Sequence, residues 1–199
     1  MSELNDHDNA SVPAELLSPL QRYERDLAAG ELMPDPAQAH AIGHVERLYQ
    51  ELIAEPAQRG SFLDRLLRRG APAADPIRGL YLWGRVGRGK TYIVDTFYDC
   101  VRDERKLRIH FHSFMRRVHG ELRQLSDASD PLSIIGRRWA TDIRLLCLDE
   151  FHVGDITDAM ILANLLRALF EHGVTLVSTS NEAPAKLYRD GLQRDRFLP

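Results

Sequence analysis

Lysine is scarce in this chain of 199 residues, which carries 26 lysines and arginines together. Lys90, Lys106 and Lys186 are its only lysines, so arginine supplies nearly all of the positive charge. A lysine ammonium is a compact point charge, whereas the guanidinium of arginine is a broad planar fork. We therefore expect Lys90, which lies among glycines, to mark a place where only a small cation fits between phosphate oxygens.

Long apolar runs and targeting segments are also missing. No apolar stretch approaches the roughly 20 residues of a membrane-spanning helix. The first residues, MSELNDHDNASVPAE, are acidic and polar and lack the apolar core of a signal peptide. These absences predict a cytoplasmic protein without a membrane span.

Cysteine and clustered positive charge are sparse as well. Cys100 and Cys147 have no metal-ligand spacing and fall in an expected helix and an expected strand, which predicts buried, reduced thiols. The net charge is −3, and no stripe of basic and aromatic residues of the kind that binds single strands occurs. We therefore expect no nucleic-acid partner.

A complete phosphate-binding motif is present. Residues 84–91 read GRVGRGKT, which matches G-x-x-x-x-G-K-[ST], and the apolar run at residues 77–83 comes directly before them, as a strand would. Glycines let the backbone turn its N–H groups toward an anion, and the following helix adds its positive dipole end. The alternative is a glycine-rich turn without a ligand. We expect a site for the phosphates of ATP formed by Gly84, Arg85, Val86, Gly87, Arg88, Gly89, Lys90 and Thr91.

A pair of carboxylates follows a second apolar run. Residues 143–148 (IRLLCL) have the length of a buried strand and end at Asp149 and Glu150. Asp149 is expected to hold Mg²⁺ through water beside the hydroxyl of Thr91. Glu150 is expected to polarise the water that attacks the nucleotide.

A third apolar run, residues 174–179, is followed by Ser180 and Asn181. A polar side chain at this point can orient water or sense the γ-phosphate. Taken alone, an asparagine here is more simply explained as a turn residue. Both readings of Asn181 stay open.

Strands and helices alternate after residue 76, which predicts an α/β fold with a parallel sheet and the nucleotide at the strand C-termini. Two helical patterns precede them, one closed by Gly30 and one opened by Asp35 and Pro36. We expect a disordered N-terminus at residues 1–13, an N-terminal helical extension at 14–75 and a P-loop ATPase core at 76–199.

Two further features admit a functional and a structural interpretation. Trp83, just before the loop, can stack on adenine, but its place in the strand pattern favours packing in the core. His110 and His112 are expected on one face of a strand over residues 106–112. Because no carboxylate or cysteine lies at metal spacing from them, a zinc site is not favoured.

Several segments resemble the ZapE cell-division ATPases of bacteria, which are related to the AFG-like ATPases of mitochondria. They are the DPAQ at residues 35–38 and residues 79–91, 109–122, 145–162, 173–181 and 187–199. The resemblance implies an AAA+-type fold with helices around a parallel sheet, and hydrolysis of ATP with Mg²⁺. It also implies a role in cell division through the tubulin-like protein FtsZ at the division ring, to which the cytoplasmic protein would be recruited.

The same resemblance assigns roles to individual residues. Residues 84–91 match the Walker A loop, Asp149 and Glu150 match Walker B, and Asn181 matches sensor 1. An arginine finger would be Arg194 or Arg196, supplied to a neighbouring subunit, which implies a nucleotide-dependent homo-oligomer.

The chain also departs from the family pattern. Arg85 stands where the family commonly has glycine, and His152 where it often has phenylalanine. The sequence ends at Pro199, where family members continue into a small helical lid, so we expect the lid to be missing from this chain. Two hypotheses therefore remain, a working ATPase and a module that binds nucleotide without hydrolysing it. A helicase-loader-like protein of the same fold is a lesser alternative.

Overall fold

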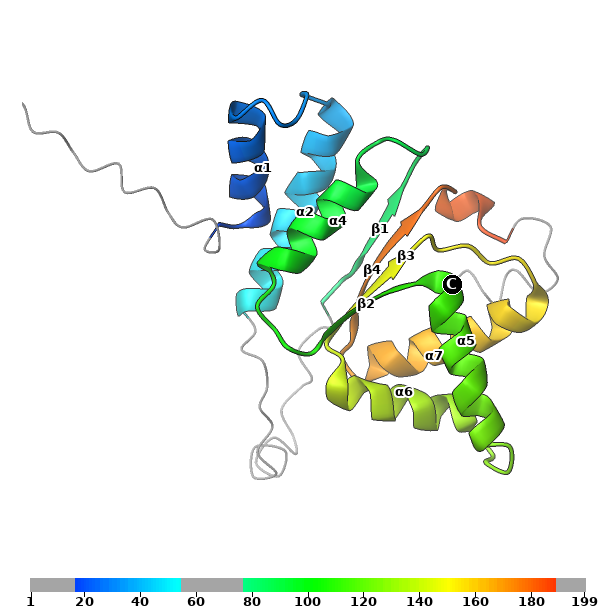
Figure 1. Cartoon of the computed structure of the whole chain (residues 1–199). Helices are drawn as coiled ribbons and strands as arrows, with labels where there is room; N and C mark the ends of the chain where they lie inside the picture. Colours follow the sequence, from blue (N-terminus) through cyan, green and yellow to red (C-terminus); the bar gives the residue numbers. More distant parts are fainter. Residues whose placement is uncertain (1–16, 55–76, 189–199) are drawn as a thin grey trace, which may run out of the picture.

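The computed structural model describes residues 17–54 and 77–188 (Figure 1). The predictions for residues 1–13, for Arg194 and for Arg196 lie outside these ranges. The helices and strands, in chain order, are α1 (Pro19–Ala28), α2 (Pro36–Ala54), β1 (Leu80–Trp83), α4 (Lys90–Cys100), β2 (Lys106–His110), α5 (Phe111–Gln124), α6 (Pro131–Asp142), β3 (Leu145–Asp149), α7 (Ile156–Glu171), β4 (Thr175–Ser180) and a short 3₁₀ helix (Pro184–Lys186).

The four strands form one parallel sheet in the order β1-β4-β3-β2. The parallel sheet with flanking helices confirms the predicted fold class. β4 lies between β1 and β3 and pairs with both of them, although β1 and β3 are far apart in the sequence. The register pairs Trp83 with Ser180 and His110 with Asp149, which brings the C-terminal ends of all four strands to one edge. The predicted functional residues follow these strand ends.

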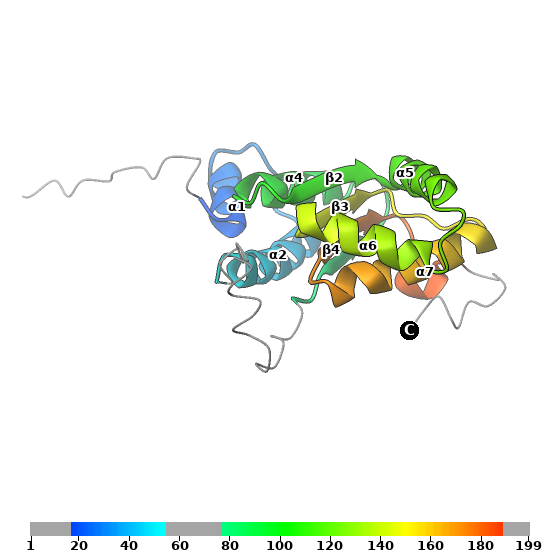
Figure 2. The same cartoon turned by 90° about the horizontal axis from the view of Figure 1, so that it is seen from below.

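Helices cover both faces of the sheet (Figures 1 and 2). On β3, Leu145 and Cys147 join a hydrophobic cluster with α1, α2 and α4, whereas Leu146 and Leu148 join a second cluster with α5, α6 and α7. Side chains alternate between the two faces of a strand, and parallel strands with both faces covered are apolar throughout. This explains the continuous apolar run that ends at Asp149.

The N-terminal helical pair shares the first of these clusters. Ser18 and Gln21 form a capping box at the start of α1, and Pro19 occupies its first turn. The Asp35 carboxylate accepts a hydrogen bond from the backbone N–H of Ala37 at 2.7 Å at the start of α2. The fully buried face of α2 packs toward α4 and consists of Ile42, Val45, Leu48 and Leu52. The extent of the extension as a unit, residues 14–75, stays a prediction.

The prediction of a strand over residues 106–112 is wrong at its C-terminal end. β2 stops at His110, and Phe111 begins α5 as a buried residue of the core. His110 and His112 therefore do not share a strand face.

Both cysteines are free and buried, as predicted. No helix in the described ranges has the length and apolar character needed to cross a lipid bilayer.

Candidate functional site

The phosphate-binding motif forms a loop between β1 and the first residue of α4. Gly87 and Gly89 have φ angles of 80° and 79°, in the left-handed region that residues with a side chain rarely adopt. A Cβ at Gly89 would also lie 2.6 Å from Nε2 of Gln38. The left-handed backbone conformation therefore favours glycine at position 89, and the flexible end of the Gln38 side chain occupies the space where a Cβ would lie.

Lys90 connects the loop to the end of β4. Its ammonium donates hydrogen bonds to the carbonyl oxygens of Gly84 at 2.5 Å and Arg85 at 3.0 Å, and to Oδ1 of Asn181 at 3.2 Å. Burial lowers the pKa of Lys90 below its usual value. Because β4 lies next to β1, the structure brings Lys90 and Asn181 together, although their roles toward a nucleotide stay predictions.

Glu150 lies in a sharp turn at the end of β3. Its φ is 57°, which costs a residue with a side chain on the order of 1–3 kcal/mol. Thr179 of β4 holds the turn, because its hydroxyl accepts from the N–H of Glu150 at 3.1 Å and its carbonyl accepts from that of Phe151 at 2.7 Å. The Glu150 side chain is 79% exposed, and His110 Nδ1 lies 3.8 Å from its Oε2. A carboxylate placed in this way can reach a water molecule.

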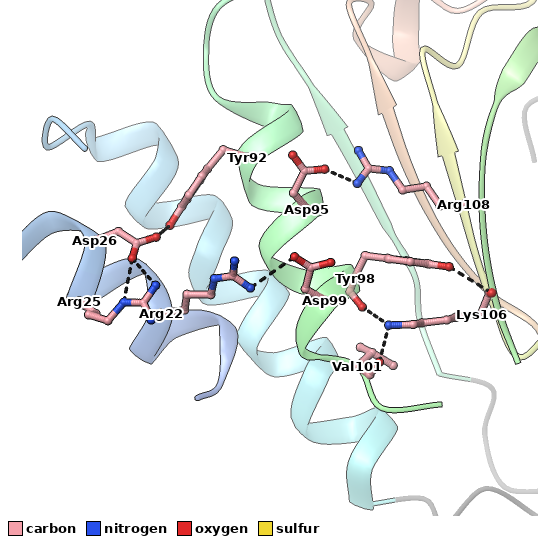
Figure 3. A network of polar contacts seen from close by, with 10 residues as sticks. All are labelled: Arg22, Arg25, Asp26, Tyr92, Asp95, Tyr98, Asp99, Val101, Lys106 and Arg108. Atoms are coloured by element: carbon pink, nitrogen blue, oxygen red, sulfur yellow. Dashed lines mark hydrogen bonds and ion pairs between the residues drawn. The ribbon is translucent and has the colours of Figure 1, made fainter. Parts of the chain in front are cut away.

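Asp149 is mostly buried and has a cationic partner that the sequence analysis missed. Nε of Arg108, on β2, donates to Oδ2 of Asp149 at 2.7 Å, and the same guanidinium pairs with Asp95 of α4 (Figure 3 shows this second contact). Burial lowers the pKa of Arg108, but hydrogen bonds to the two carboxylates outweigh it and raise the pKa above its usual value. The signal in the sequence was the alternation of polar and apolar residues in β2, which sets Arg108 apart from its apolar neighbours Leu107 and Ile109.

The predicted magnesium ligands have suitable chemistry. Thr91, the second residue of α4, supplies a hydroxyl and Asp149 a carboxylate, the oxygen donors that Mg²⁺ prefers. Among residues 17–54 and 77–188, no group of three or more His, Cys, Asp or Glu side chains could hold a metal ion. Mg²⁺ at this place would therefore depend on water and on oxygen atoms of a bound substrate, as is common for this ion.

A cavity of about 470 Å³ opens beside the loop. It joins the loop to the first turn of α2 and is lined by Ala37, Gln38, Ala41, Leu82, Trp83, Gly84, Arg85, Arg88, Lys90 and Ile93. Trp83 is 58% exposed, so the prediction that it packs in the core is wrong. The strand pattern failed here because Trp83 is the last residue of β1, which is an edge strand of the sheet.

A polar network ties α1 to α4, the helix that carries Lys90 (Figure 3). The buried carboxylate of Asp26 accepts hydrogen bonds from the Tyr92 hydroxyl at 2.6 Å and from Arg25 at 2.7 Å. Arg22 pairs with Asp99, the second-to-last residue of α4, at 3.4 Å. These contacts hold α1 against the helix that follows the phosphate loop.

Known proteins share this architecture. DnaA from Aquifex aeolicus, solved with AMPPCP bound, superposes with a TM-score of 0.53 at 14% identity, covering 83% of this chain and 44% of that one. A structure of DnaI superposes with a TM-score of 0.52 at 19% identity, covering 84% and 78%. At such low identity these similarities show the fold alone, and they confirm the predicted AAA+-type P-loop architecture.

Sequence comparison is more specific. The cell division protein ZapE of Escherichia coli strain K12 is 49% identical over 190 residues, which cover 92% of this chain and 51% of the relative. The chain thus spans about half the length of that relative. The model of the AFG1-like ATPase family matches residues 17–199, a range that contains every residue to which the sequence analysis gave a role. The family model and the close relative together show that this chain belongs to the AFG1-like ATPase family, as its resemblance to the ZapE proteins predicted.

Proposed function

We propose that this protein hydrolyses ATP to ADP and phosphate in a Mg²⁺-dependent reaction. The observation that carries the proposal is the contact between Lys90 and Asn181, 3.2 Å apart, at the sheet edge where β3 ends at Asp149 and Glu150 follows in the turn. The shared fold also supports it, because a DnaA of similar architecture was solved with the ATP analogue AMPPCP.

Each residue has a defined part in this reaction. The N–H groups of residues 84–91 and the Lys90 ammonium would neutralise the phosphates, with Lys90 exchanging its carbonyl partners at Gly84 and Arg85 for phosphate oxygens. Glu150 would accept a proton from water as the water oxygen bonds to the γ-phosphorus. The bond from that phosphorus to the β,γ-bridging oxygen then breaks and releases ADP. Asn181 would orient the water.

Magnesium would supply charge neutralisation between the phosphates, and Asp149 and Thr91 would hold it. Arg108 pairs with Oδ2 of Asp149 at 2.7 Å, so a cation held at that oxygen would compete with this guanidinium. If Mg²⁺ does not replace Arg108 at Asp149, this ion pair favours the second candidate function, a module that binds nucleotide without hydrolysing it.

Binding and turnover in the full-length protein test the proposal. Lys90→Ala should weaken ATP binding at least about tenfold or abolish hydrolysis, because it removes the cation from the phosphates. Lys186→Ala, at an exposed position of the 3₁₀ helix, is the control and should leave both unchanged. Unaltered binding and turnover in Lys90→Ala would refute the phosphate site.

A second pair of variants separates binding from chemistry. Glu150→Gln should bind ATP with Mg²⁺ and hydrolyse it far more slowly, whereas Asp149→Asn should weaken the Mg²⁺-dependent part of binding. If the wild-type protein binds ATP and does not turn it over, the binding-module hypothesis replaces the ATPase.

We further propose that the activity acts on the FtsZ ring in the cytoplasm at the division site, on the basis of family membership and of the name of the E. coli relative. Sedimentation of FtsZ polymers with the protein and ATP tests this, with Glu150→Gln as the inactive control. Polymers that sediment equally with both proteins would argue against it. Binding to single-stranded DNA would instead favour the helicase-loader alternative.

We also propose that the active site is completed in a homo-oligomer. An arginine from a neighbouring subunit, Arg194 or Arg196, would stabilise charge on the γ-phosphate in the transition state. Mixing a doubly substituted Arg194→Ala, Arg196→Ala protein with a Lys90→Ala protein should restore part of the activity. No recovery, together with turnover per subunit that is independent of protein concentration, would place hydrolysis within one subunit.

A further inference from the structure

The side-chain oxygen of Gln38, in the first turn of α2, accepts no hydrogen bond. Its Oε1 is buried and receives no hydrogen bond, and in the part of the chain that the structure describes it is the one buried side-chain nitrogen or oxygen in this condition. Buried polar atoms are nearly always paired, because an unpaired one loses its hydration without compensation. An exception beside a phosphate-binding loop is a candidate ligand contact.

The neighbours of Gln38 define which end of its amide is the donor. Nε2 donates to the carbonyl oxygen of Arg88 at 3.4 Å and lies against Gly89. The Asp35 carboxylate holds this arrangement from the other side, since it accepts from the N–H of Gln38 at 3.4 Å and lies 3.8 Å from the Arg88 guanidinium. An amide nitrogen has two hydrogens, so Nε2 keeps one for a further acceptor.

The cavity beside Gln38 suits a flat heterocycle attached to phosphates. Its volume of about 470 Å³ falls in the range of ligand sites. Apolar side chains and the exposed ring of Trp83 line one part of it, and the loop residues, including Lys90, line the other. A base between these walls would place its polar edge toward α2.

We propose that Gln38 selects adenine over guanine, an inference that rests on the proposed nucleotide site. A glutamine amide pairs with adenine through two hydrogen bonds, accepting from the N6 amino group and donating to N7. Oε1 and the remaining hydrogen of Nε2 supply this pair. A small shift of the amide toward the cavity breaks no hydrogen bond at Oε1, because that atom has none.

Guanine is disfavoured for a reason visible in the structure. Its O6 is an acceptor and would face Oε1, which is also an acceptor. Turning the amide over would satisfy O6 but would place Oε1 against the carbonyl oxygen of Arg88, where Nε2 now donates. The Arg88 carbonyl therefore enforces the orientation that reads adenine, and the N-terminal helical pair contributes the base specificity of the site.

The test measures Kd for ATP and for GTP by competition with a fluorescent nucleotide, using the full chain. The wild type should prefer ATP by about tenfold or more, within the range expected for one bidentate pair. Gln38→Ala should bring the two affinities within about threefold of each other. Gln38→Glu keeps the size of the side chain beside Gly89 but loses the donor, so it should also lose the preference.

Two controls separate base reading from support of the loop. Gln50→Ala, on the same helix, removes an amide that donates to Glu46 at 2.8 Å and should retain the wild-type ratio. Lys90→Ala should weaken ATP and GTP equally. If the Gln38 variants behave like Lys90→Ala, with both affinities reduced and the ratio kept, Gln38 only supports the loop and the proposal is overturned.

The wild type alone distinguishes the two levels of inference. Equal affinities for ATP and GTP would overturn base selection by Gln38 and leave the proposed nucleotide site standing. Binding of neither nucleotide would overturn the proposed function itself.

Discussion

The hydroxyl of Tyr92 ties the N-terminal helices to α4, and its removal should loosen the support of the phosphate loop. It donates to Oδ2 of Asp26 at 2.6 Å, and the Asp26 side chain is only 6% exposed. Hydrogen bonds to charged groups contribute about 1.5–3 kcal/mol. Tyr92→Phe keeps the ring and its contact with Tyr23, so the free energy of unfolding should fall by about that amount.

The loss should depend on pH. Burial raises the pKa of Asp26, but hydrogen bonds from Tyr92 and Arg25 outweigh it and lower the pKa below the ordinary 3.8. A lowered pKa stabilises the fold above about pH 3.8 and ceases to do so as pH falls through the folded value. Burial and the hydrogen bond to Asp26 raise the pKa of Tyr92 to about 12. The stabilisation of the fold by the Tyr92 hydroxyl is therefore complete below about pH 10 and is lost between about pH 10 and 12.

Urea unfolding followed by circular dichroism, at several pH values, measures the effect. Tyr98→Phe is the matched control on the same helix, because the Tyr98 hydroxyl donates to the neutral carbonyl of Lys106 at 3.2 Å. It should cost about 0.5–1.5 kcal/mol with no acid dependence through Asp26. Equal losses in the two variants, together with an Asp26 carboxyl whose NMR titration is unchanged in Tyr92→Phe, would refute the reasoning.

Three further perturbations follow from single contacts. Gly79→Ala would place a Cβ 1.9 Å from the backbone oxygen of Leu176 and so push β1 away from β4. The free energy of unfolding should fall by roughly 1–3 kcal/mol. A fall below about 0.5 kcal/mol in urea unfolding would contradict this close approach. Arg108→Gln removes the competitor for Asp149, and the Mg²⁺ concentration for half-maximal ATP binding should fall about tenfold, whereas a rise would show that Arg108 assists the ion. Burial raises the pKa of Cys147 to about 12, so a thiol reagent should modify it only at the rate of unfolding, and rapid labelling of the native protein would contradict its burial.

The sequence by itself determined the phosphate loop, because a loop of this kind works through its own backbone. Gly87, Gly89 and Lys90 act within a few residues of one another, and their spacing carries the geometry. The apolar runs likewise predicted strands that end in Asp149 and Asn181, because the hydrophobic pattern of a short segment indicates which of its side chains are buried. Family membership also followed from these segments.

Tertiary structure decided which of these residues meet. The insertion of β4 between β1 and β3 brings Asn181 to Lys90, and the pairing of β2 with β3 brings Arg108 to Asp149. Strand order depends on how helices pack over both faces of the sheet, which local periodicity does not record. The approach of Gln38 to the loop, across 50 residues of sequence, has the same origin, because it depends on where α2 docks against α4.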